Sequence, residues 1–474
     1  MLMNDDRAAR HSDTLSRRES IRRCSLGLSG VSLASQITFK NLLASEAPMT
    51  SASSELSGSF GQAKSVILFW LNGGPAQQES WDPKPAAPVE VRGPYSPIAT
   101  RTPGLNVCEL MPRTANLTDK IAVLRAVVTN DNAHSSSGYA MLTGIPHQPL
   151  NAESVTAKSP NLHPSVDAVV RYLRPVRNGL PGSIVLPEHI WNDGNFPWPG
   201  QDAGILGRKH DPWLIHCDPD SPSFHVPALA FPHEISSTRF DQRRSLLEQV
   251  NRRLDQTLHS PLVGQYSEES HQAIGLLSAT ASRKAFDLSS ESTATRDRYG
   301  RSRYAQSVLL ARRLVEAGVS IVRINWPRIP DKPNQGGWDT HAQHSQCCKD
   351  FLMPMMDNAY SALLEDLDQR GLLDSTLVVW VGEFGRTPRF NANGGRDHWG
   401  HVFSMAMAGG GVRGGSVHGS SDKDSAHPVE GRVEPQDVIA TVFHCLGHHP
   451  DTIIHDTLGR PIPISRGEVI HQIL

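Results

Sequence analysis

The chain has 474 residues, of which 38% are hydrophobic and 20% are charged, a composition typical of a globular protein with a sizeable core. The length allows one large α/β domain or two ordinary ones. Its 46 basic and 48 acidic residues give a formal net charge of −2, a balance that excludes a general electrostatic attraction to nucleic acid or to an anionic membrane.

The N-terminus has the features of an export signal in the required order. Arg17 and Arg18 precede a weakly apolar, Gly/Ser-rich stretch at 26–34, and a run of small residues follows at 44–47. A cleavable signal needs this order of basic, apolar and small residues, and the apolar stretch is far too short to span a bilayer. We therefore predict a twin-arginine-type signal peptide over residues 1–47 and an exported, periplasmic or extracellular protein, with a disordered basic tail as the alternative.

The part that follows the signal is predicted to be one domain. Residues 48–61 are Ser-rich and are expected to form a flexible lead-in. Residues 62–474 are expected to form a single α/β domain. Within it, the periodic pattern weakens around 150–295, which indicates a less regular insertion. A polar, exposed helix is predicted inside this insertion at 240–258.

Unbroken apolar runs predict strands that are covered on both faces, as in a parallel sheet. Helical periodicity at 296–317, and again from Leu352 to an end near Gly371, alternates with such runs. This alternation of helix and strand favours a parallel α/β sheet over a bundle or a sandwich. The predicted strands are 66–71, 121–128, 183–186, 319–324 and 376–381.

Four loops after predicted strands are rich in metal-binding or anion-binding residue types. The first, 72–75, has two glycines that let the backbone approach a ligand, and Glu79 and Asp82 follow it; an ordinary tight turn is the alternative. The second begins with His134 and contains Ser137. An imidazole and hydroxyls there can bind or attack an electropositive phosphorus or sulfur, and a serine-rich N-cap is the alternative.

The third and fourth loops contain the carboxylates and imidazoles of a possible metal site. Asp339 and His341 lie two residues apart and can both reach one divalent ion. Arg386 and Arg396 can clamp a tetrahedral oxyanion. The fourth loop adds a set of oxygen and nitrogen ligands, namely Glu383, Asp397, His398 and His401.

Other residues that often carry chemistry give weaker indications. The six cysteines form no Cys-x-x-Cys pair, so neither a zinc ribbon nor a thioredoxin-type site is indicated. The pair Cys347-Cys348 is expected to serve packing. The Gly-rich stretch 408–415 lacks the Lys-Ser/Thr of a phosphate-binding loop and is expected to be a turn.

Taken together, these motifs resemble the bacterial domain-of-unknown-function family numbered 1501, which is abundant in planctomycetes and grouped with the alkaline-phosphatase/sulfatase-like superfamily. The resemblance implies a doubly wound, mostly parallel sheet with helices on both faces and a metal-bearing site. The resembling stretches span nearly the whole mature chain, at 72–75 with 81–85, 338–341, 370–374, 382–388 and 395–399.

The chain departs from the superfamily pattern at several positions. In the sulfatase signature, His134 falls at the position of the nucleophile and Gly138 at that of an arginine. Glu383 replaces a metal-binding aspartate, and the next residue, Phe384, cannot ligate. Asn72 stands where the first strand normally delivers an aspartate.

From the resemblance and the residues together, we predict an exported metal-dependent hydrolase of phosphate or sulfate esters, sulfated polysaccharides among them. One or two divalent ions (Zn²⁺, Mn²⁺ or Ca²⁺) are expected, and the partner is a small-molecule or polysaccharide ester. The rival is a non-catalytic sulfatase-like fold that binds carbohydrate or a surface partner. His134 is expected to act as general base, nucleophile or ligand. The expected catalytic residues are His134, Ser137 and Arg386, and the expected metal ligands are Asp339, His341, Glu383, Asp397, His398, His401, Glu79 and Asp82.

Overall fold

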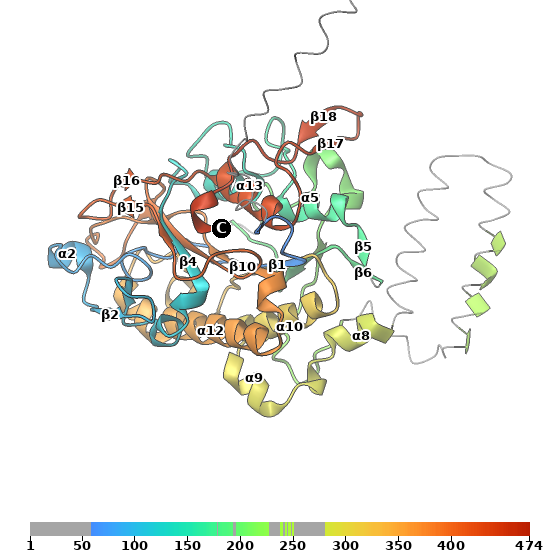
Figure 1. Ribbon diagram of the computed structural model, residues 1–474, viewed down its shortest axis with the longest axis horizontal. Coiled ribbons are helices and arrows are strands. Elements are labelled where there is room, and N and C mark those ends of the chain that lie inside the picture. Colours follow the sequence, from blue (N-terminus) through green and yellow to red (C-terminus); the bar gives the residue numbers. More distant parts are fainter. Residues whose placement is uncertain are drawn as a thin grey trace, which may run out of the picture. The chain divides into compact units, whose positions relative to one another are not determined.

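An eight-stranded sheet runs through the described part of the computed structural model, in the order β14-β4-β13-β10-β1-β9-β7-β8 (Figure 1). The structure describes residues 58–177, 179–192, 196–226 and 280–474, together with short pieces between 238 and 250. The predicted signal peptide, most of the predicted lead-in and most of the predicted helix at 240–258 lie outside these residues.

Within the sheet, β13 alone runs antiparallel to both of its neighbours, β10 and β4. All other neighbouring strands pair in parallel. This confirms the predicted mostly parallel α/β class. The strands are β1 (Ser65–Trp70), β4 (Ile121–Val127), β7 (Ser183–Leu186), β8 (Trp213–Leu214), β9 (Ile321–Asn325), β10 (Thr376–Val381), β13 (Phe403–Ala408) and β14 (Val417–His418).

Helices cover both faces of this sheet, as the doubly wound class requires (Figure 1). Alternate residues of β1 show why its sequence is apolar throughout, because Ile67 and Phe69 face one hydrophobic core while Leu68 and Trp70 face the other. The first core is completed by α10 (Arg303–Glu316) and α12 (Met353–Gln369). The second is completed by α4 (His134–Thr143), α5 (Val166–Leu173) and α13 (Pro435–Cys445).

The direction of the strands brings the loops that carry the predicted site residues to one edge of the sheet. Strands β1, β4, β9 and β10 are parallel in the sheet's order, so their carboxyl ends share an edge. Because β13 runs the opposite way, the residues just before it lie at that same edge. The chain therefore delivers its ligand-bearing loops, including the one before β13, to one place.

Smaller elements surround the sheet. The short helices are α2 (Val89–Arg92), α3 (Pro112–Ala115), α8 (Thr280–Phe286) and α11 (His344–Cys347). The two-stranded hairpins are β2 (Pro97–Ala99) with β3 (Asn106–Cys108), β5 (Val176–Arg177) with β6 (Leu180–Pro181), β11 (Gly385–Arg386) with β12 (His398–Trp399), β15 (Ser420–Ser421) with β16 (Pro428–Glu430), and β17 (Ile453–His455) with β18 (Pro461–Pro463).

Two sequence predictions differ from the structure in detail. The helical pattern at 296–317 is divided between α9 (Thr293–Tyr299) and α10, because Gly300 adopts a left-handed φ of 105° that ends the first helix. The region 150–295 contributes α5, β7 and β8 to the main fold. Among the described residues, no helix is long and apolar enough to cross a membrane.

Candidate metal centre

Three histidines from separate loops direct their Nε2 atoms at the carboxylate of Asp339. His134 Nε2 lies 3.2 Å from Oδ2, while His341 Nε2 and His398 Nε2 each lie 3.0 Å from Oδ1. His341 Nε2 and His398 Nε2 lie 2.9 Å from each other. Among the described residues, His134, Asp339 and His398 form the one group of three whose ligand atoms all lie close enough to hold a metal ion.

Each of these histidines is anchored through its other ring nitrogen. His134 Nδ1 lies 2.7 Å from Glu383 Oε1, and His341 Nδ1 lies 2.7 Å from Asp397 Oδ1. His398 Nδ1 lies 2.7 Å from the backbone oxygen of Asn132. A carboxylate or a carbonyl oxygen accepts hydrogen bonds, so each Nδ1 carries the donated proton. In a neutral imidazole this proton on Nδ1 leaves the lone pair on Nε2, the atom that faces Asp339.

The convergence of these groups calls for positive charge at the point where they meet. A neutral imidazole with its proton on Nδ1 turns an Nε2 lone pair toward the Asp339 carboxylate, and these groups repel one another unless a proton or a metal cation lies between them. Metal-binding histidines characteristically donate their second nitrogen to a carboxylate or a backbone carbonyl. The cluster has this pattern at each of its three imidazoles, so its residues have the chemistry that could hold a metal ion.

The spacing of the ligand atoms suits a small divalent ion. Around a tetrahedral Zn²⁺ with bonds of roughly 2.0–2.1 Å, ligand atoms are about 3.3 Å apart. The observed separations of 2.9–3.2 Å are a few tenths of an ångström shorter. Small side-chain movements would therefore open the cluster around an ion.

Asp339 is held as an anion at the centre of the cluster. Burial raises the pKa of its carboxyl, but Arg386 and the three histidines outweigh burial and hold that pKa far below its usual range. Arg386 Nη2 donates to Asp339 Oδ1 at 2.6 Å. The backbone of Asp339 lies against Gly73, whose φ is 107° and where an added Cβ would fall 2.3 Å from Asp339 N. Glycine is therefore required at position 73 for this close approach.

The histidines differ in how readily they carry a proton. Burial lowers the pKa of His134, but the hydrogen bonds to Asp339 and Glu383 outweigh it and raise that pKa to about 10. For His398, burial dominates and lowers the pKa to about 4, against the hydrogen bond to Asp339. The hydrogen bond to Asp339 raises the pKa of His341. In the metal-free protein, a proton on His134 thus meets part of the demand for positive charge.

A cavity of about 400 Å³ opens onto this cluster. That volume is within the range of pockets that hold small molecules. Two tryptophans and several amides give it flat apolar walls and hydrogen-bonding groups. Its lining includes His134, Asp339, His341 and His398, together with Asn72, Glu153, Trp191, Asn192, Trp198, Arg328, Asn334 and Gln335.

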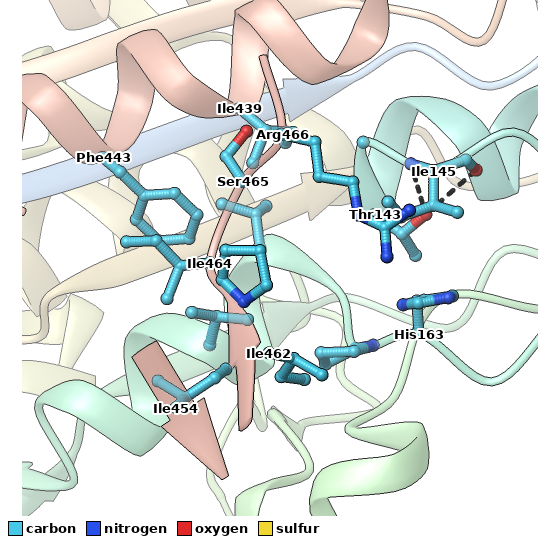
Figure 2. Close-up of a pocket in the computed structure, with 15 residues that line it drawn as sticks. Thr143, Ile145, His163, Ile439, Phe443, Ile454, Ile462, Ile464, Ser465 and Arg466 are labelled. Carbon is cyan, nitrogen blue, oxygen red and sulfur yellow. Dashed lines mark hydrogen bonds between the residues drawn. The ribbon is translucent and has the colours of Figure 1, made fainter. Parts of the chain in front are cut away.

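A second hollow lies where α4, α13 and β18 meet, and it is much smaller. It holds about 20 Å³, and its wall includes the apolar side chains of Phe443, Ile454 and Ile462 (Figure 2). Such a space admits about one water molecule. It is therefore too small to be a substrate site.

Comparison with known proteins places the chain in a family. The family described as "Protein of unknown function (DUF1501)" matches residues 63–474. The chain belongs to the DUF1501 family. No curated protein sequence matches it.

Solved structures with some similarity to this DUF1501 chain include three enzymes. The PsFucS1 sulfatase from Pseudoalteromonas sp. is 14% identical, with 83% of this chain and 70% of that chain covered and a TM-score of 0.38. The phosphonate monoester hydrolase SpPMH from Silicibacter pomeroyi is 11% identical, with 86% and 75% covered and a TM-score of 0.38. The lipoteichoic acid synthase LtaP from Listeria monocytogenes is 10% identical, with 82% and 74% covered and a TM-score of 0.34. Identities this low say nothing of the chemistry of the DUF1501 chain.

Several site residues predicted from the sequence meet in the DUF1501 structure, but in two different positions. The ligand atoms of His134, Asp339 and His398 all lie within 4.8 Å of one another, and His341 Nε2 lies 3.0 Å from Asp339 Oδ1. Glu383 and Asp397 instead contact the far nitrogens of His134 and His341. These two carboxylates orient the imidazoles rather than face the point where the Nε2 atoms meet.

Two predicted catalytic residues are buried behind the cluster instead of lining the cavity. The Ser137 hydroxyl donates to Glu383 O at 2.6 Å, and its Oγ lies 2.8 Å from Thr129 Oγ1, so it fixes the backbone of Glu383. The Arg386 guanidinium donates to the backbone oxygens of Gly73, Gly74 and Arg396 as well as to Asp339. Ser137 thus fixes the backbone of Glu383, and Arg386 fixes the Asp339 carboxylate and the backbone of the neighbouring loops.

Three predicted ligands lie elsewhere. His401 packs against the rings of Trp399 and His427. Glu79 is buried and pairs with Arg396 at 2.7 Å and with His344 at 3.2 Å. Asp82 pairs with Lys84 and Arg125 and accepts from Ser421. The carboxylates of Glu79 and Asp82 already have cationic partners, and His401 packs against aromatic rings, so the proposed ligand set contains none of the three.

Sequence reasoning missed three contributors to the site. The carbonyl of Asn132 orients His398, but a backbone oxygen has no sequence signature. The ring of Phe384, noted only as unable to ligate, stacks on His398 with ring centroids 4.6 Å apart and contacts His134 at 4.9 Å. Arg328 lines the cavity and donates to the backbone oxygens of Trp191 and Asn192. A lone arginine in a Pro-rich segment gives no signal of this position.

Proposed function

We propose that this protein is a metal-dependent hydrolase of phosphate or sulfate esters, with one divalent ion bound by His134, Asp339, His341 and His398. The observation that carries the proposal is that all three imidazoles have Nδ1 anchored to an oxygen acceptor while every Nε2 converges on one carboxylate. Three imidazole nitrogens and a carboxylate favour Zn²⁺ over Mn²⁺ and over Ca²⁺, because the latter two ions prefer oxygen ligands.

A divalent ion at this point would polarise an ester oxygen and lower the pKa of a coordinated water. The residues of the chain prepare the site for that chemistry. Glu383 and Asp397 fix the orientation of two imidazoles, and Arg386 holds the Asp339 carboxylate in place. Such fixed geometry is what allows electrostatic stabilisation without rearrangement during the reaction.

His134 serves as a ligand in this proposal rather than as a covalent nucleophile. Its Nδ1 is held by Glu383, and its Nε2 faces Asp339 within the cluster. Neither ring nitrogen is therefore left to attack an ester. The sequence left general base, nucleophile and ligand open, and the geometry favours the last.

The cavity wall suits an ester carried on a sugar or another flat group. Trp191 and Trp198 offer aromatic faces, while the side chains of Asn192, Asn334 and Gln335 are hydrogen-bonding amides. Arg328 supplies the cation of the lining that is not a histidine, and a guanidinium is suited to sulfate or phosphate oxygens. Sulfated polysaccharides are the substrate class we propose to test first.

The direct test is turnover by the full chain loaded with Zn²⁺ or Mn²⁺. Hydrolysis of 4-nitrophenyl sulfate or 4-nitrophenyl phosphate should require the ion, stop on chelation and be lost in His398→Ala. His401→Ala is the matched control, since His401 lies outside the cluster. A protein that holds the ion and binds sulfated oligosaccharides but turns over no ester would favour the non-catalytic alternative.

A further inference from the structure

A carboxylate outside the proposed set of metal ligands also lines the cavity. Glu153 lines it together with His134 and Asp339. Its Oε2 accepts a hydrogen bond of 2.6 Å from the backbone N–H of His134, the first residue of α4. The helix N-terminus carries partial positive charge and would otherwise attract an anion. Glu153 already places a negative charge there.

The segment that carries Glu153 is fixed against α4 at two further points. Asn132 N donates to Asn151 Oδ1 at 2.8 Å, and Ala152 N donates to Ser136 Oγ at 3.0 Å. Asn151 and Ser154 both have left-handed φ angles, of 54° and 51°. Such conformations cost free energy in residues other than glycine and persist only where the surroundings impose them. The carboxylate of Glu153 is thus held at a defined place beside the metal cluster.

We propose that Glu153 determines substrate specificity by charge, favouring a monoanionic ester such as a sulfate monoester over a dianionic phosphate monoester. The inference rests on the proposed function and narrows it. Each negative charge on the reacting group is repelled by the Glu153 carboxylate, so a dianion is penalised twice where a monoanion is penalised once. Glu153 is exposed, so solvent screens part of this repulsion, and one extra charge on the ligand changes affinity by up to about ten-fold.

The test compares two ligands of nearly equal size that differ by one charge. At about pH 8, methyl phosphate is a dianion, while methyl sulfate is a monoanion. Their dissociation constants are measured by calorimetry with the Zn²⁺-loaded full chain. The wild type should bind methyl phosphate less well, relative to methyl sulfate, than a variant without the Glu153 charge does. Glu153→Gln, which keeps an oxygen acceptor for His134 N–H, should shift the ratio of the two constants by up to about ten-fold toward methyl phosphate.

The control variant is Glu109→Gln. Glu109 also accepts a backbone N–H, from Ser96 at 2.9 Å, but it does not line the cavity, so the ratio should stay at the wild-type value. Metal content and melting temperature establish that each variant is folded and loaded. An unchanged ratio in Glu153→Gln, or binding of neither anion by wild type and variant alike, overturns the inference.

This outcome is separable from that of the proposed function. A loaded protein that shows the shifted ratio without ester turnover would keep the role of Glu153 and remove the hydrolase. Ester turnover with an unshifted ratio would keep the hydrolase and remove the role of Glu153.

Discussion

The imidazole of His134 donates through Nδ1 to Glu383 at 2.7 Å, and this bond turns its Nε2 toward Asp339. Glu383 Oε1 also accepts from Gly73 N at 2.7 Å, so one carboxylate ties the loop after β10 to the loop after β1 and to the start of α4. The geometry of the metal cluster is therefore built on a carboxylate that does not itself face the common point.

Replacement of His134 separates two roles for this residue. If His134 is a ligand, His134→Ala lowers metal affinity, and activity falls by roughly two orders of magnitude or more because the ion is lost. Metal content and turnover are measured on the same sample. Loss of activity with the ion fully retained would instead indicate a general base.

Replacement of Glu383 tests the orientation of the imidazole. Glu383→Gln removes the charge that fixes His134 but leaves all four proposed ligands, so metal affinity should fall by about 10- to 100-fold. Competition with a chelator of known affinity measures it, with His401→Ala as the unchanged control. Complete loss of the ion would show that Glu383 is itself a ligand, as the sequence suggested.

Acid sensitivity should arise in part from Glu79, away from the proposed ligands. Burial raises the pKa of its carboxyl, but Arg396 and His344 outweigh burial and lower that pKa from 4.5 to about 2. A folded-state pKa below the unfolded value gives stability that is present above about pH 4.5 and is lost as pH falls toward 2. Denaturant unfolding at several pH values should show this loss in the wild type.

The matched variant is Glu79→Gln, which leaves Arg396 buried without its charged partner. It should be destabilised by about 3–5 kcal/mol near neutral pH and should lose less stability than the wild type between pH 4.5 and 2. An equal acid dependence in both proteins would assign the effect to other carboxylates.

We predict that residues 1–47 direct export of the chain. Replacing Arg17 and Arg18 together by Lys should leave the precursor in the cytoplasm, because the twin-arginine route reads that pair. Fractionation and immunoblotting of the tagged full chain measure it. Unchanged export of the double variant would rule out this route.

The sheet was largely predictable from the sequence because strands buried on both faces are apolar throughout. β1, β4, β7 and β10 were predicted close to their observed bounds. β13 was not among the predicted strands, and its reversed direction was not predicted either, since the residues of a buried strand do not encode its orientation. Yet this reversal is what brings His398 to the ligand edge.

The site was predictable in residue type but not in the role of each residue. Spacing brought together Asp339, His341 and His398, but it could not show that Glu383 and Asp397 would contact the far ring nitrogens. That depends on distances of a few ångströms between loops. Glu79 comes after β1 and the glycine loop at 72–75, like a predicted ligand. Its side chain instead pairs with Arg396, which is 317 residues away in the sequence and could not be predicted as its partner.

The most direct test of the central claim is an anomalous-difference map from crystals of the full chain grown with Zn²⁺. The proposal predicts one strong peak at roughly 2.0–2.2 Å from Nε2 of His134, His341 and His398 and from a carboxylate oxygen of Asp339. The absence of a peak at this point in crystals that contain the ion, or a peak bound by Glu79 and Asp82 instead, would contradict it.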